Sequence, residues 1–267
     1  MAKQLATVLI PVYKPQPDAV ERLCLQQCIK VLGHYPVVFV CPIGFDGTAY
    51  AAECAGIIPF NMAQFPSQYF RNISGYNQLM LSAAFYKYFI DSSYILIHQL
   101  DAYIFRDELA YWCSQNYDYV GAPHLPHTND PGDIRFLKGY SNVVTCVNHL
   151  FKTNHKISNV GNGGFSLRKT IACYRLLRLL NKKVGAWGVN NEDGFFKYWG
   201  NICYPFFRLP ADEIALHFAI EENPSASLKK LGGKLPFGCH AFQKYEPETW
   251  DLYIHFSSLL NKPIDGH

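Results

Sequence analysis

The chain has 267 residues, a formal net charge of +3, an apolar fraction of 49% and an aromatic fraction of 15%. These values fit one large globular domain over residues 1–267 and exclude a disordered chain. With so small a charge and no block of Lys and Arg, we do not expect a nucleic-acid-binding protein. The sequence has no run of roughly 18–20 apolar residues, the length of a membrane span.

Nine cysteines are scattered along the chain without a C-x-x-C pair. An odd number at irregular spacing indicates reduced, mostly buried thiols rather than a disulfide framework. We therefore expect a cytoplasmic protein, one that could still make peripheral contact with the inner face of the plasma membrane.

The first 41 residues predict a strand, a helix and a second strand. Leu5–Val12 is a short apolar run typical of a buried strand. Asp18 and Glu21 have the spacing of a capping box, so a helix should begin there and end near Gly33. Pro36–Cys41 is the second buried strand. This βαβ pattern predicts an α/β fold whose sheet begins parallel.

Periodicity and apolar runs predict the remaining elements. The expected helices are Gly75–Asp91, Asp107–Gln115, Lys169–Asn181, Glu192–Trp199, Ala211–Glu221 and Tyr253–Leu260. The expected strands are Ser93–Leu100, Tyr117–Gly121 and, as a strand or turn, Asn162–Leu167. The last helix could touch a membrane or a partner, or could equally pack on the domain.

The segment Pro123–Val160 is rich in polar residues, Pro and Gly, and we expect a long loop of the functional or mobile kind. His124 and His127 form an H-x-x-H pair within it. No other metal-ligating residue lies close to this pair in the sequence, so we interpret both histidines as ordinary loop residues.

Asp101 follows a buried strand within the sequence Gln99-Leu100-Asp101-Ala102-Tyr103. Ligands of open α/β folds bind at the carboxyl edge of the sheet, where such a carboxylate lies. A metal–diphosphate complex needs few protein carboxylates, because phosphate and water supply other oxygen ligands. A simple turn-capping role for Asp101 fits the sequence about equally well.

Residues 161–168, GNGGFSLR, combine paired glycines with Asn162 and an arginine. Gly163 and Gly164 could adopt positive φ and let a ligand approach the backbone closely. A tight turn before a strand is the alternative, but the preceding polar segment favours a ligand-binding wall.

Residues 186–193, AWGVNNED, place two adjacent carboxylates after an aromatic residue and a glycine. Glu192 could bind acceptor hydroxyls, and Asp193 could accept the proton of an attacking hydroxyl. Acidic residues are also common at helix N-termini for electrostatic reasons alone, and taken by itself this second explanation is the stronger. Further on, His240 in PFGCHAF could be a metal ligand, a phosphate contact or a buried, hydrogen-bonded histidine.

In this order, the pieces QLDAYIF, GAP, GNGGFSLR, ED and PFGCHAF resemble the GT-A glycosyltransferases. The nearest resemblance is to a bacterial family described only as a domain of unknown function with glycosyltransferase-like features. The match extends from about Tyr94 to Phe242, and Ile10–Lys14 also resembles a GT-A nucleotide-binding start. The resemblance implies a GT-A-like (Rossmann-like) fold with a mixed, mostly parallel sheet flanked by helices.

The resemblance also implies roles for particular residues. Asp101 and His240 would hold a divalent metal, Mn²⁺ or Mg²⁺, on the donor diphosphate. Asp193 would be the catalytic base of an inverting transfer, with Glu192 at the acceptor. The implied donor- and acceptor-binding residues are Pro11, Tyr13, Asn77, Gln99, Asp101, Asn162, Gly163, Gly164, Trp187 and Gly188.

The implied partners are a nucleotide-sugar donor and a glycan or lipid-linked acceptor, in polysaccharide biosynthesis such as that of lipopolysaccharide. One position departs from the family pattern, because Tyr103 stands where a second Asp is usual in D-x-D. A sugar nucleotidyltransferase is disfavoured, since the loop after the first strand contains no glycine to hold a triphosphate. A glycan-binding or degenerate transferase-like subunit remains the alternative.

Overall fold

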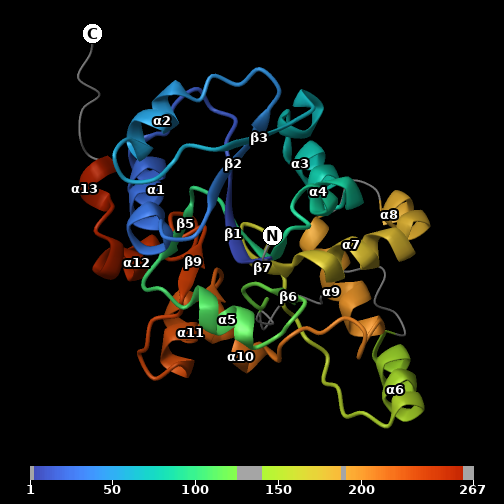
Figure 1. Cartoon of the computed structure of the whole chain (residues 1–267). Helices are drawn as coiled ribbons and strands as arrows, with labels where there is room; N and C mark the ends of the chain where they lie inside the picture. Colours follow the sequence, from blue (N-terminus) through green and yellow to red (C-terminus); the bar gives the residue numbers. More distant parts are fainter. Residues whose placement is uncertain (1–2, 125–139, 188–190, 261–267) are drawn as a thin grey trace.

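The computed structural model describes residues 3–124, 140–187 and 191–260 (Figure 1). The first half contains β1 (Gln4–Pro11), α1 (Ala19–Leu32), β2 (Val37–Pro42), α2 (Thr48–Cys54), β3 (Met62–Phe65), the 3₁₀ helix η1 (Ser67–Phe70), α3 (Ile73–Met80), α4 (Ala83–Tyr88), β4 (Ser92–His98), β5 (Ala102–Ile104), α5 (Leu109–Ser114) and β6 (Tyr119–Val120). The second half contains α6 (Tyr140–Phe151), β7 (Phe165–Lys169), α7 (Thr170–Leu179), α8 (Asn181–Trp187), α9 (Glu192–Ile202), α10 (Asp212–Phe218), β8 (Ala219–Ile220), α11 (Pro224–Lys230), β9 (Gly238–His240), α12 (Pro247–Ile254) and α13 (Ser257–Leu260).

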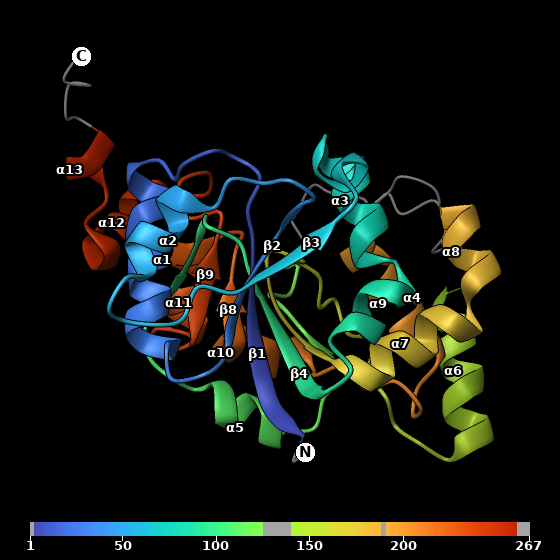
Figure 2. The same ribbon diagram turned by 45° about the horizontal axis from the view of Figure 1, so that its top comes forward.

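The main sheet has six strands in the order β3-β2-β1-β4-β7-β6. The first four of these strands are parallel, and β7 runs antiparallel to both β4 and β6. The predicted mixed, mostly parallel sheet is therefore confirmed. Figure 2 shows the parallel strands with helices on both faces of the sheet.

Alternate residues of β1 enter two separate cores, as the two-residue period of a strand requires. Val8 and Ile10 pack with Leu25 and Ile29 of α1 on one face. Leu9 points to the other face, into a core built mainly by α4, α7 and α9. The capping box predicted for α1 is present, with the Asp18 side chain and the Glu21 side chain each accepting from the other residue's backbone N–H.

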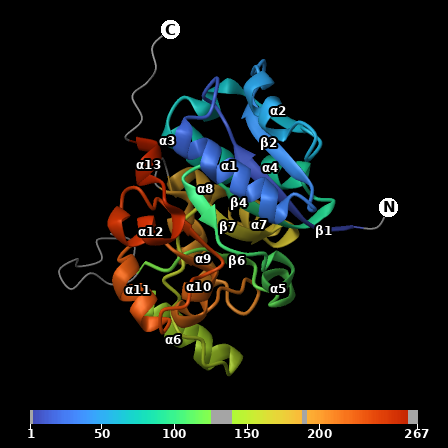
Figure 3. The same cartoon turned by 90° about the vertical axis from the view of Figure 1, so that its left-hand side faces the viewer.

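A small second sheet, β5-β9-β8, lies beside the main one. In its ladder Ala102 pairs with His240, so β9 brings the late histidine next to Asp101. A third core, which includes Cys24 of α1 and Trp250 of α12, supports this sheet from outside. Figure 3 shows α12 and α13 beside α1 on that side of the molecule.

Several predicted boundaries were wrong. The helix expected over Gly75–Asp91 is two helices, α3 and α4, separated by an extended Ser82. The apolar spacing of three and four residues continues across this break, so periodicity could not reveal it. The helix expected over Ala211–Glu221 ends at Phe218, where the chain enters β8.

Two longer segments also differ from expectation. The segment expected to be a loop, Pro123–Val160, contains the twelve-residue helix α6. The polar composition of the segment concealed this helix, in which Val144 is the one buried residue among those whose burial is described. The helix expected over Tyr253–Leu260 is divided into α12 and α13 by His255, whose φ is 57°.

All nine cysteines are free, and seven of them are buried. Among the helices of the described residues, none is both long and apolar enough to cross a bilayer.

Candidate active site

One cavity of about 810 Å³ opens at the carboxyl ends of β1 and β4. Its volume is in the range of typical small-molecule sites, about 300–1,000 Å³. The predicted site residues that line it are Pro11, Tyr13, Asn77, Gln99, Asp101, Asn162, Gly163, Gly164, Glu192, Asp193 and His240. Residues about 230 positions apart in the sequence thus share one cavity, as the switch-point geometry of an open α/β sheet predicts.

One predicted residue that the structure describes, Trp187, is not part of this wall. Trp187 is buried in the core behind the cavity, where its ring packs on Phe195 and its Nε1–H donates to the Asn191 carbonyl at 3.1 Å. Its role here is to anchor the start of α9. Gly188 lies outside the described residues.

Asp101 and His240 meet at the cavity wall. Asp101 Oδ1 lies 3.1 Å from His240 Nε2, and His240 Nδ1 lies 3.2 Å from Glu221 Oε1. Burial alone would lower the pKa of His240, but Asp101 and Glu221 outweigh that effect and raise it to about 10. His240 is therefore a cation between two carboxylates at neutral pH.

Tyr103 shows why the second acid of a D-x-D is absent. Its ring packs against Phe105 and Phe242, with centroids 5.4 and 6.4 Å away. A carboxylate at this half-buried position would lose part of its hydration against the aromatic rings, which is costly.

The residues around Asp101 offer only part of a metal site. Within the described residues, no three His, Cys, Asp or Glu side chains are placed to bind a metal ion together. Asp101 Oδ1 is nevertheless buried and, apart from the ion pair with His240, has no hydrogen-bonding partner. A carboxylate oxygen and an imidazole fit a divalent cation whose remaining ligands come from a diphosphate and water.

The GNGG segment has a different conformation from the expected one. The residue with positive φ is Asn162, at 65°, whereas the glycines around it have no positive φ. The glycines are required for space instead. An ideal Cβ would lie 2.2 Å from His124 Nε2 at Gly161, 1.9 Å from Glu192 Oε1 at Gly163 and 2.0 Å from His240 Nε2 at Gly164.

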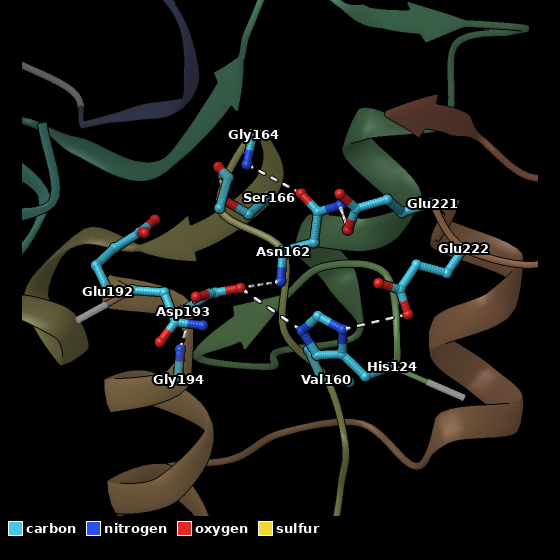
Figure 4. A network of polar contacts seen from close by, with 12 residues as sticks. His124, Val160, Asn162, Gly164, Ser166, Glu192, Asp193, Gly194, Glu221 and Glu222 are labelled. Atoms are coloured by element: carbon cyan, nitrogen blue, oxygen red, sulfur yellow. Dashed lines mark hydrogen bonds and ion pairs between the residues drawn. The ribbon is translucent and has the colours of Figure 1, made fainter. Parts of the chain in front are cut away.

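Asn162 links several parts of the site. Its backbone N–H donates to Asp193 Oδ2 at 2.7 Å, and its side-chain oxygen accepts from the Gly164 N–H at 3.0 Å. Its side-chain amide donates to Glu221, and its carbonyl accepts from the Tyr119 hydroxyl at 3.0 Å. Asn162, a single residue in the left-handed conformation, therefore links Asp193 to Glu221 (Figure 4).

Glu192 is held by a fully buried arginine. Arg168 Nη2 donates to Glu192 Oε1 at 2.8 Å, and the same guanidinium donates to Ser166, Tyr86 and the Gly163 carbonyl. Burial raises the pKa of Glu192, and the positive charge of Arg168 only partly opposes this. With a side chain only 5% exposed, Glu192 supports the loop and has little surface to offer an acceptor.

Asp193 is the second residue of α9 and lines the cavity. Besides the Asn162 N–H, it accepts from the Gly194 N–H at 2.8 Å and lies 3.6 Å from His124 Nε2. Burial alone would raise the pKa of Asp193, but His124 and these N–H groups hold it below its usual value. Asp193 is thus ionised at neutral pH.

His124 belongs to the site, contrary to its interpretation as an ordinary loop residue. Its Nδ1 lies 3.9 Å from Glu222, so the ring sits between Glu222 and Asp193 (Figure 4). Contacts with Asp193 and Glu222 raise the pKa of His124 to about 9, against the opposing effect of burial. No local sequence signal identifies these partners, which are 69 and 98 positions away; His127 lies outside the described residues.

The family described as "Protein of unknown function (DUF5672)" has a model that matches residues 59–240. No curated protein matches the sequence.

Three of the solved structures with a similar fold are described as glycosyltransferases. Galactosyltransferase LgtC, in complex with donor and acceptor sugar analogues, has a TM-score of 0.54 at 11% identity, covering 97% of this chain and 98% of LgtC. Mouse xyloside xylosyltransferase 1 has a TM-score of 0.51 at 10% identity, covering 88% of this chain and 96% of that one. The bifunctional glycosyltransferase WbbM has a TM-score of 0.50 at 9% identity over 98% of this chain, which spans 50% of WbbM's length. At such identities the similarity defines the fold, which is GT-A-like.

Proposed function

The chain belongs to the family of unknown function DUF5672, and we propose that it is a glycosyltransferase. It would move a sugar from a nucleotide-diphosphate sugar to a hydroxyl of a glycan or lipid-linked acceptor. The observation that carries this proposal is the 810 Å³ cavity, which Asp101, His240 and Asp193 all line at the carboxyl edge of a GT-A-like sheet.

In this proposal the diphosphate of the donor lies near Asp101 and His240. These two residues would hold a divalent cation, Mn²⁺ or Mg²⁺, which offsets the charge that develops on the leaving diphosphate. His240 would have to release its Nε2 proton to bind the cation. Without the cation, the positively charged His240 would pair with a phosphate oxygen in exchange for its contact with Asp101.

Asp193 is the proposed base. Its ionised carboxylate could accept a hydrogen bond from the acceptor hydroxyl and take its proton as the new C–O bond forms. A single base with attack from the face opposite the leaving group gives a product of inverted configuration. His124 and the two N–H donors keep Asp193 ionised and oriented, and Arg168 positions Glu192 beside it.

One observation favours the alternative, a glycan-binding or degenerate transferase-like subunit. His240 already forms ion pairs with both Asp101 and Glu221, so neither carboxylate depends on a bound metal for a positively charged partner. Such a protein would bind a sugar or nucleotide without transferring it.

Thermal-shift measurements against UDP-, GDP-, dTDP- and CMP-sugars, with and without Mn²⁺, test the proposal, because a ligand that binds only the native state stabilises it. We expect one nucleotide to give a selective, Mn²⁺-dependent shift. Incubation of that donor with glycan acceptors should then yield a product of inverted anomeric configuration, measured by NMR. A thermal shift without any sugar transfer or donor hydrolysis supports the binding subunit. If no nucleotide sugar shifts the melting temperature, both the proposed nucleotide-sugar donor and the proposed transferase activity are contradicted.

A further inference from the structure

A long stretch of the chain carries basic residues and no acidic ones. Between Asp133 and Glu192 there is no Asp or Glu, although the whole chain has 21 of them. The basic residues of this stretch are Arg135, Lys138, Lys152, Lys156, Arg168, Lys169, Arg175, Arg178, Lys182 and Lys183. Because acidic residues elsewhere in the chain offset these positive charges, the net charge of +3 does not reveal their uneven distribution along the sequence.

The described part of this stretch forms β7, inside the main sheet, and three helices along one side of the fold. It supplies α6, α7 and α8, which occupy the right-hand side of the molecule in both Figure 1 and Figure 2. Arg175, Arg178, Lys182 and Lys183 are exposed on α7 and α8. Arg168 and Lys169 differ from them, since they are engaged with Glu192 and Asp118.

Large apolar side chains are exposed on the same side. Leu179 at the end of α7 is 76% exposed, and Leu150 of α6 is 74% exposed. Phe206 is 79% exposed, and its ring lies 5.6 Å from that of Phe151 at the end of α6. We call α6, α7, α8 and Phe206 together the basic face; its exposed Lys and Arg side chains lie on α7 and α8, whereas α6 contributes apolar side chains.

We propose that the basic face docks the protein on an anionic lipid surface. Lys and Arg side chains beside exposed Leu and Phe are the combination that binds membrane interfaces, where charge attracts lipid headgroups and apolar side chains enter the acyl boundary. A nucleic acid would use the charges but not Leu150, Leu179 or Phe206. A second copy of this face is disfavoured, because it would bring like charges together.

Flotation with vesicles of phosphatidylcholine, with or without phosphatidylglycerol, tests the proposal without any sugar donor and so does not depend on the proposed function. We expect binding only to the vesicles that contain phosphatidylglycerol, and weaker binding as salt is added. Since a basic residue at the surface changes lipid binding about five-fold, the double variant R178Q/K182Q should bind about twenty-five-fold more weakly.

Two further variants distinguish binding through the basic face from a non-specific attraction between the whole protein and anionic vesicles. L179N should also weaken binding, without changing the charge. The matched control K229Q/K230Q removes two exposed lysines from α11, away from the basic face, and should bind as the unchanged protein does. The proposal is overturned if phosphatidylglycerol has no effect, if the control loses as much binding as R178Q/K182Q, or if single-stranded RNA binds through the same residues while vesicles do not.

Discussion

The substitution Arg168→Met tests whether the buried guanidinium organises the site. Arg168 is fully buried and donates to Glu192, Tyr86, Ser166 and the Gly163 carbonyl. Methionine fills much of the same space but leaves the Glu192 carboxylate without a cation. Removing one member of a buried ion pair costs about 3–5 kcal/mol.

The compensating variant Glu192→Gln distinguishes the effect of the unpaired Glu192 charge from the effect of the lost Arg168 side-chain volume. In the Arg168→Met background it removes the unpaired charge, so it should recover about 2 kcal/mol or more of the loss. Urea unfolding monitored by tryptophan fluorescence measures all four corners of this cycle. The reasoning is refuted if Arg168→Met costs less than about 1 kcal/mol, or if the two substitutions are additive.

Three other predictions concern the cavity. Asp193→Asn should lower transfer about 10²–10⁴-fold while the donor-induced thermal shift persists; equal loss of donor binding would contradict a role as base. His124→Gln should lower the melting temperature most below pH 6.5, with the difference shrinking up to about pH 9, because a raised folded-state pKa stabilises only while the group is protonated; a difference that grows with pH would contradict the His124–Asp193 pair. Gly164→Ala should displace His240 and abolish the Mn²⁺-dependent shift, whereas the control Gly185→Ala, in open space on α8, should retain it and gain about 0.5–1 kcal/mol of stability; equal behaviour of the two would show that the space at Gly164 is not critical.

Local patterns in the sequence predicted the scaffold. The βαβ start, the capping box of α1 and the buried strand before Asp101 all depend on residues within a few positions of one another. A carboxylate that closely follows a strand lies near the edge of the sheet, so the position of Asp101, three residues after β4, followed from the same pattern. The same patterns failed at two places. The apolar periodicity continued across the helix break at Ser82, and the polar composition around α6 concealed a helix.

Only the tertiary structure determined how the site is assembled. His124 meets Asp193 across 69 positions, and Arg168 meets Glu192 across 24, through contacts that no local spacing encodes. The need for glycine at positions 161, 163 and 164 also arises from tertiary packing. Their missing side chains make room for His124, Glu192 and His240, which come from other parts of the chain. Sequence patterns determine what each segment can form, whereas the charge balance and free space of a site depend on which segments pack together.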